Sequence, residues 1–429
     1  MTGPVSERAP RPALERRREW LRPGLMALVA FLAIVGPGII TANVDNDAGG
    51  ITTYSLAGAR YGYTLLWTMI PVMLALIVVQ EMCSRMGAVT GKGLADLIRE
   101  NFGVKLTFLL MVGLLFANLA NTMAEFSGLA ASGEIFGVTK YVSVPVGAIF
   151  VWWLVVKGSY RQVEKVFLVA CLFYISYILS GLLARPDWGQ VARHTITPTI
   201  SLRPAFITMM IGVVGTTIAP WMQFYLQSAV VDKGVTARDY GYCRTDVITG
   251  CVVAIIVAFF ILLTTGATLY EHHIPINTAE DAALALKPLA GRYCSYLFAF
   301  GLLNASVFAA SILPLATAYS VCEGIGWERG INRTFREAPE FYGLYTALIV
   351  IGAGLILVPG APLLLIMYAS QVINGILLPV VLVFMLVLIN DSGLMGRYRN
   401  SRLFNFIAWA TTILVSALTL ALVVTMFIH

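Results

Sequence analysis

Two aspartates lie in a segment that is otherwise apolar enough to cross a membrane. Residues 36–55 read GPGIITANVDNDAGGITTYS, which places Asp45 and Asp47 beside Asn43 and Asn46. An unpaired carboxylate at the bilayer centre costs about 2.5–3.5 kcal/mol on insertion scales, so acidic residues at this depth usually mark functional sites. Carboxylate oxygens are also hard ligands for metal cations. The pattern predicts a cation site at Asp47, with the two asparagines contacting water bound to the ion.

Other roles for these acids remain open at this stage. Asp47 is also compatible with a protonated or helix-capping residue in a structural kink. Asp45 either joins the ion site, caps the helix that follows, or lines the aqueous path. The bound cation is the simplest counter-charge for Asp47, because no basic residue is expected at the same depth in the two interrupted spans described below.

The composition shows which class of protein carries these residues. The chain has 429 residues, of which 58% are hydrophobic and 12% are charged, and its mean hydropathy is +0.80. These values predict an all-α polytopic membrane protein. Runs long enough to cross about 30 Å of hydrocarbon recur along the chain and give about eleven spans. We place them at 23–60, 64–83, 104–132, 141–156, 164–184, 204–231, 246–270, 293–320, 340–358, 361–390 and 403–428.

The basic residues predict the topology. Most of the 29 Lys and Arg residues fall in the N-terminal tail and in alternate loops. We expect the protein to lie in the plasma or inner membrane. The positive-inside rule then places its N-terminus in the cytoplasm. An odd number of spans places the C-terminus outside. We expect residues 1–22 to form a disordered cytoplasmic tail and residues 23–429 to form one transmembrane domain.

The first and sixth predicted spans are interrupted by polar and helix-breaking residues. The sixth reads GVVGTTIAPWMQFYLQSAVVDKG, with the break at residues 215–220. Unsatisfied backbone groups in hydrocarbon cost several kcal/mol each, so such a break indicates a site where protein, water or an ion satisfies them. The two breaks lie five spans apart. This predicts an inverted repeat of residues 23–184 and 204–390, an extra helix at 403–428, and a substrate site between the halves.

The residues around the first break resemble the natural-resistance-associated macrophage protein (Nramp) family of divalent-metal transporters. The family pattern is G-P-G, eight residues, D-P-G-N and then A-G-A-x-Y-G-Y; this chain has GPG at 36–38, DAGG at 47–50 and AGARYGY at 57–63. Similar segments continue through GAVTGKGLADLIRE, ARPDW, YLQS and SQVINGILLP. The resemblance implies an eleven-helix, LeuT-like fold with alternating access, and we expect a monomer.

The resemblance also implies a metal site, with two informative departures. The family site combines an Asp and an Asn of helix 1, a carbonyl and a Met of helix 6, and a Gln of helix 10. Here the Asp is Asp47 and the Gln is Gln371, but the Asn position holds Gly50 and the Met position holds Ala219. We expect Asp47, the helix-end carbonyls near Ala219 and the side chain of Gln371 to form the metal site, largely through water. A thioether favours softer metals, so its loss leaves a roomy, oxygen-only site. Gln223, one turn past the break, either reaches a hydrated ion or makes an interhelical hydrogen bond.

This chain also lacks two of the three titratable groups that form the proton pathway of the family. Proton-coupled members have a His after the Met-Pro of helix 6, and an Asp and a Glu in helix 3 as T-D-L-A-E. Here Trp221 stands at the His position, Thr122 stands at the Asp position, and Glu125 is retained. Trp and Thr do not carry a proton near neutral pH, which predicts uptake without proton coupling. Glu125 is either a remnant of the relay or a helix-packing residue.

These observations lead to one hypothesis and three alternatives. The leading hypothesis is a secondary transporter that imports Mg²⁺, and also Mn²⁺, partly hydrated and uncoupled from protons, as in the Nramp-related magnesium transporters. Mg²⁺ keeps several waters and usually binds one or two carboxylates, which suits such a site. The alternatives are a proton-coupled Mn²⁺/Fe²⁺ carrier, an amino-acid carrier on the LeuT-like fold, and an ion channel. We expect no cofactor, no nucleic-acid partner and no enzymatic activity, because no catalytic motif is present.

Overall fold

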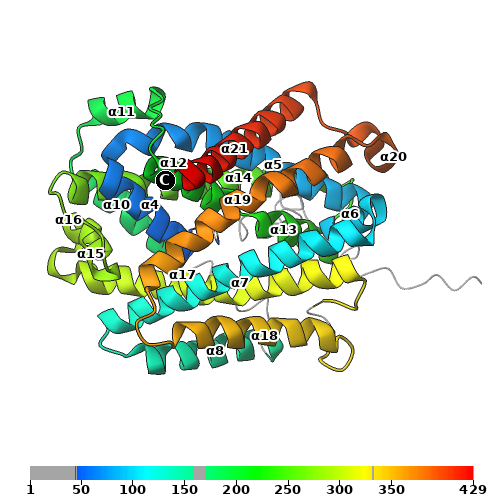
Figure 1. The fold of residues 1–429 in the computed structure, drawn as a ribbon, viewed down its shortest axis with the longest axis horizontal. Helices are drawn as coiled ribbons and strands as arrows, with labels where there is room; N and C mark the ends of the chain where they lie inside the picture. The colour runs from blue at the N-terminus through cyan, green and yellow to red at the C-terminus, as the bar shows by residue number, and fades with distance from the viewer. Residues whose placement is uncertain (1–43, 45, 158–170, 331–332, 429) are drawn as a thin grey trace, which may run out of the picture.

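The computed structural model describes residues 44, 46–157, 171–330 and 333–428. All regular elements in these ranges are helices (Figure 1). The predicted tail, the first half of the first span, Asn43, Asp45 and the start of the fifth span lie outside the described residues.

The helices follow the order of the predicted spans. The first half contains α4 (Ala48–Tyr61), α5 (Met69–Thr90), α6 (Leu94–Phe102), α7 (Val104–Ile135), α8 (Lys140–Val156), α10 (Ile175–Leu183) and α11 (Trp188–Ile196). The second half contains α12 (Pro204–Thr217), α13 (Pro220–Asp232), α14 (Tyr240–Thr265), α15 (Ala279–Ala283), α16 (Lys287–Ala290), α17 (Cys294–Ile325), α18 (Pro339–Ile356), α19 (Leu363–Asn390), α20 (Ser392–Met395) and α21 (Arg402–Ile428). Short turns of 3₁₀ or π helix connect several of them at Gly62–Thr68, Cys171–Tyr174, Gly266–Tyr270, Leu284–Leu286, Gly291–Tyr293 and Gly396–Tyr398.

Eight helical runs in the described residues are long and apolar enough to cross a membrane. The first of them, Ala48–Thr90, joins the second half of the first predicted span to the second span. Helix α8, with 17 residues, falls just short of this length, and the fifth predicted span is described only from residue 171. These three features account for the difference between eight runs and the eleven spans expected from the sequence.

The break in the sixth span lies at Ile218 and Ala219. Helix α12 ends at Thr217 and α13 begins at Pro220, which has no N–H group to continue the hydrogen-bond ladder of α12. Ala219 adopts an extended backbone (φ −66°, ψ 136°), as expected for a residue that precedes proline. The first span is broken where expected: Asn46 and Asp47 are not helical, and α4 starts at Ala48.

Two long helices, α7 and α17, lie side by side along the length of the molecule, with α8 and α18 on one flank (Figure 1). Helices α4, α12, α14 and α19 pack on the other side, and α21 packs against α12 and α19. Contact between α12 and α19 is backbone to backbone. A Cβ on Gly215 would lie 2.1 Å from the carbonyl oxygen of Gln371, and one on Gly375 would lie 2.5 Å from that of Ile211. Small residues permit this approach and place Gln371 beside the break in the sixth span.

We expect Gly215→Ala to destabilise the transmembrane domain, because its Cβ would collide with main-chain atoms that no rotamer change can move. Overpacking of this kind costs about 1–3 kcal/mol or more. Gly354→Ala on α18 is the matched control, since a Cβ there meets nothing within 4 Å. Melting temperatures of the purified proteins in detergent measure the effect. Equal values for Gly215→Ala and wild type would show that the two helices are not in this close contact.

Candidate functional site

Asp47 is buried at the first turn of α4, with 5% of its surface exposed. Its Oδ1 accepts a hydrogen bond from the backbone N–H of Gly50 at 2.7 Å, so Asp47 is the N-cap of α4. The capping role that the sequence allowed for Asp47 is therefore present, while Asp45 lies outside the described residues. A carboxylate has about four acceptor positions, and capping leaves others open. The cap and a bound cation are compatible.

Glu125 on α7 lies against the same turn. Its Oε2 accepts a hydrogen bond from the backbone N–H of Ala48 at 3.3 Å, and its carboxyl group contacts that of Asp47. Its other oxygen, Oε1, has no hydrogen-bond partner among the described residues. Two buried carboxyl groups in contact repel each other unless a proton or a cation lies between them. Glu125 is thus part of the site, beyond the packing role that the sequence left open.

Gln371 on α19 lies directly beside Asp47's helix turn, as the resemblance implies. A Cβ on Gly49 would be 1.9 Å from Gln371 Nε2, so the amide touches the first turn of α4. The amide oxygen is engaged, because Gln371 Oε1 accepts a hydrogen bond from Asn374 Nδ2 at 3.0 Å. The predicted neighbour is therefore present, with its nitrogen toward α4.

The break in the sixth span offers the candidate site fewer free carbonyl oxygens than the sequence predicts. The Ala219 carbonyl accepts a hydrogen bond from Met222 N at 3.1 Å, because Ala219 is the N-cap residue of α13. The Gln223 amide fits its surroundings with its nitrogen facing the carbonyl oxygens of Ala219 and Pro220, at 2.7 and 2.6 Å. The Gln223 amide nitrogen therefore binds the start of its own helix, not a neighbouring helix, and contact of the Gln223 oxygen with a hydrated ion stays a prediction. The Ala219 carbonyl already has partners within α13.

A hydrogen bond of 2.7 Å between Tyr54 Oη and Thr217 Oγ1 ties α4 to the end of α12. Together with the contact of Gly215 on Gln371, it brings the two helix breaks to one region of the fold. The convergence predicted from hydropathy therefore holds for α4, α12 and α19.

Asn46 lies beside the site but outside the cluster of acids. Its Nδ2 donates to the Ala254 carbonyl on α14 at 3.3 Å, its backbone carbonyl accepts from Tyr174 Oη at 2.6 Å, and its Oδ1 has no partner among the described residues. That unpartnered oxygen is available to water, as the outer-shell prediction requires. Gly50 offers only its backbone N–H, which serves the cap.

Neither Trp221 nor Thr122 adds a titratable group to the site. Trp221 is buried and packs against Tyr225, with ring centroids 6.2 Å apart. Thr122 donates to the Asn118 carbonyl at 2.8 Å, and a Cβ on Gly352 of α18 would lie 2.8 Å from its Cγ2. Thr122 therefore faces α18, while Glu125 on the same helix faces Asp47.

Two asparagines lie next to Gln371, and one of them, Asn121, is a residue that the sequence analysis does not single out. Asn121 of α7 and Asn374 of α19 exchange hydrogen bonds of 2.9 and 3.0 Å, and Asn374 also holds Gln371. The available signal was a polar amide in each of two apolar helices, a pattern typical of interhelical contacts. Which amide pairs with which depends on the packing of α7 on α19.

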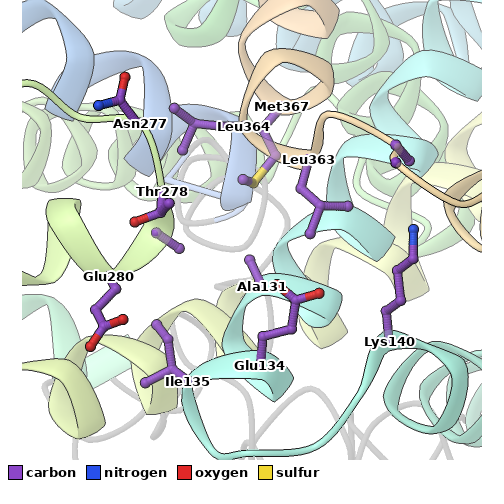
Figure 2. A pocket seen from close by; sticks show the side chains of 13 residues that line it. Ala131, Glu134, Ile135, Lys140, Asn277, Thr278, Glu280, Leu363, Leu364 and Met367 are labelled. Carbon is purple, nitrogen blue, oxygen red and sulfur yellow. The ribbon is translucent and has the colours of Figure 1, made fainter.

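A pocket of about 490 Å³ opens at the end of the fold where α7 finishes and α19 starts. Glu134 and Glu280 lie at its border, and Met367 lies across the pocket from them (Figure 2). Met367 Sδ accepts a hydrogen bond from Thr52 Oγ1 on α4 at 3.5 Å. Met367 therefore links the lining of the pocket to α4 at Thr52, one helical turn after Ala48.

The opposite end of α7 and α17 is held by an ion cluster of Asp96, Glu323 and Arg329. Glu323 Oε1 accepts from Ser228 Oγ of α13 at 2.6 Å and pairs with Arg329 Nε at 3.2 Å. Arg329 also binds Asp96 Oδ2 of α6 at 2.7 Å. The cluster joins α6, α13 and the end of α17.

Comparison with known proteins relates this geometry to a family. The family described as natural resistance-associated macrophage protein-like matches residues 38–425. The divalent metal cation transporter MntH of Burkholderia ambifaria is 26% identical over 434 residues, which cover 97% of this chain and 93% of that protein. The protein of the same name from Granulibacter bethesdensis is 26% identical over 411 residues, covering 92% of this chain and 89% of that protein.

Solved structures share the fold. The Eremococcus coleocola manganese transporter, in complex with an aromatic bis-isothiourea compound, matches with a TM-score of 0.77 at 22% identity over 94% of this chain and 88% of that one. A nucleobase-cation-symport-1 family transporter matches with a TM-score of 0.54 at 16% identity over 87% and 81%. These matches confirm the all-helical, LeuT-like fold predicted from the sequence. The chain belongs to the natural resistance-associated macrophage protein-like (Nramp) family, and it is a membrane transporter, not an enzyme.

Proposed function

We propose that this chain is a secondary transporter of divalent metal cations that imports Mg²⁺, and also Mn²⁺, in a partly hydrated form. The relatives named as divalent metal cation transporters, and the neighbour described as a manganese transporter, support the class of substrate. The observation that carries the proposal is the contact between the buried carboxyl groups of Asp47 and Glu125. No ion pair of the described residues includes either of them, so a cation is the fitting counter-charge.

The preference for Mg²⁺ follows from the atoms that surround this pair. Ala219 has no sulfur to offer, Gly50 has no side chain, and the oxygen of Gln371 is bound to Asn374. An ion at Asp47 and Glu125 would therefore meet one or two carboxylates and otherwise water. Mg²⁺ is bound in this way because it dehydrates reluctantly. Mn²⁺ also accepts oxygen ligands and is carried by the same site.

Transport without proton coupling follows from the surroundings of Glu125. Trp221 carries no titratable group, and Thr122 faces α18, so no described side chain continues a relay at those positions. The contact between the carboxyl groups of Asp47 and Glu125 favours the proton-coupled alternative, because a proton shared by the two groups would leave when the metal binds. An amino-acid carrier is disfavoured, because Asp47 occupies the helix N-terminus that would hold a substrate carboxylate.

The two ends of the path support an assignment of the access state. The pocket lined by Met367 lies at one end of α7, and the cluster of Asp96, Glu323 and Arg329 joins α6, α13 and α17 at the other end. Under the positive-inside rule the pocket faces outside, the N-terminal tail at 1–22 is cytoplasmic, and the C-terminus lies outside. The conformation is then open to the outside and closed to the cytoplasm.

The variant Asp47→Asn separates the two roles of this residue. Asn caps helices about as well as Asp, so we expect the melting temperature to stay close to that of wild type. The charge is lost, so uptake of Mg²⁺ and Mn²⁺ into reconstituted liposomes should fall about tenfold or more, which corresponds to ~1.4 kcal/mol of lost binding. Asp47→Ala should lose both stability and uptake. Wild-type uptake by Asp47→Asn would assign the residue to capping alone.

Proton coupling is tested with a pH dye inside the same liposomes. We expect metal entry without acidification, and uptake that rises steeply with an inside-negative potential, because each charge gains about 2.3 kcal/mol per 100 mV. Protein-free liposomes, and liposomes that contain Asp47→Asn, are the controls. Acidification in step with metal entry would favour the proton-coupled alternative.

Removal of Arg329 should weaken the closed end. Arg329→Ala leaves the fully buried Glu323 without its ion-pair partner, whereas Asp96 keeps Arg99 at 3.2 Å. Breaking a buried pair costs about 3–5 kcal/mol, and we expect about 1–3 kcal/mol because Arg329 is 26% exposed. Melting temperatures report the loss. The double variant Glu323→Gln/Arg329→Ala should recover part of it by removing the stranded charge; no recovery would mean that the pair does not stabilise this end.

A further inference from the structure

A chain of buried amides connects α7 to the candidate metal site. Asn121 and Asn374 exchange two hydrogen bonds, and Asn374 Nδ2 also donates to Gln371 Oε1 at 3.0 Å. Gln371 Nε2 donates in turn to Ser370 Oγ at 3.1 Å, and Ser370 Oγ donates to the Met367 carbonyl at 2.9 Å. Asn121, Asn374 and Gln371, the amide chain, are each at most 2% exposed.

The hydrogen-bond partners fix the direction of the amide chain. Ser370 uses its only hydrogen on the Met367 carbonyl, so its oxygen must accept from Gln371. The Gln371 nitrogen therefore faces Ser370, and its oxygen faces the Asn374 amide group. If Gln371 alone flipped, its oxygen would face the Ser370 oxygen and its nitrogen would face the Asn374 nitrogen. If all three amides flipped together, Ser370 would have to give up its bond to the Met367 carbonyl in order to donate to Gln371. The orientation shown keeps every one of these hydrogen bonds.

This orientation matters at the site where we place the cation. The Gln371 nitrogen lies against Gly49 in the first turn of α4, and Asp47 caps that turn. An amide nitrogen with its hydrogens does not bind a cation, whereas an amide oxygen does. The group of Gln371 that would serve as a direct ligand is thus held by Asn374.

We propose that Asn374, positioned by Asn121, is a specificity-determining residue that keeps the Gln371 oxygen away from the metal. The ion then retains a water in that position. Mg²⁺ loses water reluctantly, so this arrangement favours it relative to Mn²⁺, which exchanges a water for an amide oxygen more readily. The inference rests on the proposed function, because it requires a divalent cation at Asp47.

A purely structural role would give a different result. Buried amides on facing helices also serve as interhelical contacts, and a loss of such contacts lowers stability without regard to the metal. The selectivity between two metals is therefore the decisive quantity. Asn118 provides the matched control: it is a buried asparagine on α7, one turn before Thr122, and its amide has no hydrogen-bond partner among the described residues.

The experiment measures competing Mg²⁺ and Mn²⁺ uptake by the full-length protein in liposomes. In Asn374→Ala we expect the preference for Mn²⁺ over Mg²⁺ to rise about threefold to tenfold. This range corresponds to the net free energy of one hydrogen bond. Asn374→Leu, which leaves no large cavity, should give the same shift. Asn121→Ala should give a smaller shift in the same direction, and Asn118→Ala should give none.

The double variant Gln371→Ala/Asn374→Ala decides whether the effect passes through Gln371. We expect its metal preference to equal that of Gln371→Ala alone, because no oxygen remains to be released. The inference is overturned if the shift persists in the double variant, or if both Asn374 variants lower uptake of the two metals equally. A wild-type protein that carries neither metal would instead overturn the proposed function.

Discussion

The buried carboxyl group of Asp47 at the first turn of α4 is the constraint on which the rest of the site depends. A broken helix inside a membrane leaves backbone N–H groups without partners, and the Asp47 carboxylate satisfies one of them at Gly50. The same carboxylate then introduces a charge that the bilayer disfavours. Glu125 adds a second acid in contact with it, so the two groups together require a proton or a cation.

The surrounding helices are arranged around this turn by very close contacts. Gly128 of α7 packs on Ala48, where a Cβ would lie 2.5 Å from the Ala48 side chain, and Gly49 lies against the amide of Gln371. Gly215 brings α12 onto the backbone of α19. Glycine at these positions allows polar groups of three helices to meet in a space that larger side chains would fill. The site therefore depends on small residues as much as on the acids.

The polar groups that line the site differ in what they can still bind. Asp47 retains acceptor capacity after capping, and Glu125 Oε1 and Asn46 Oδ1 have no partners among the described residues. The Ala219 carbonyl and the Gln371 oxygen are already engaged by Met222 and Asn374. The free acceptors are thus the carboxylates and Asn46, which together suit an ion that keeps part of its water shell.

The sequence by itself determined the fold class and the identity of the charged residue. Hydropathy predicted the helices, and proline and glycine predicted the break before Pro220, because these residues act locally on the backbone. Asp47 was identified for the same reason: a charge in an apolar span is conspicuous in any context. Tertiary structure decided the rest. It placed Glu125 against Asp47, turned Gln223 back onto its own helix, and joined Asn374 to Gln371. These contacts join residues from different helices or depend on how each amide is oriented. They are set by the way α4, α7 and α19 pack, which no local pattern of residues records.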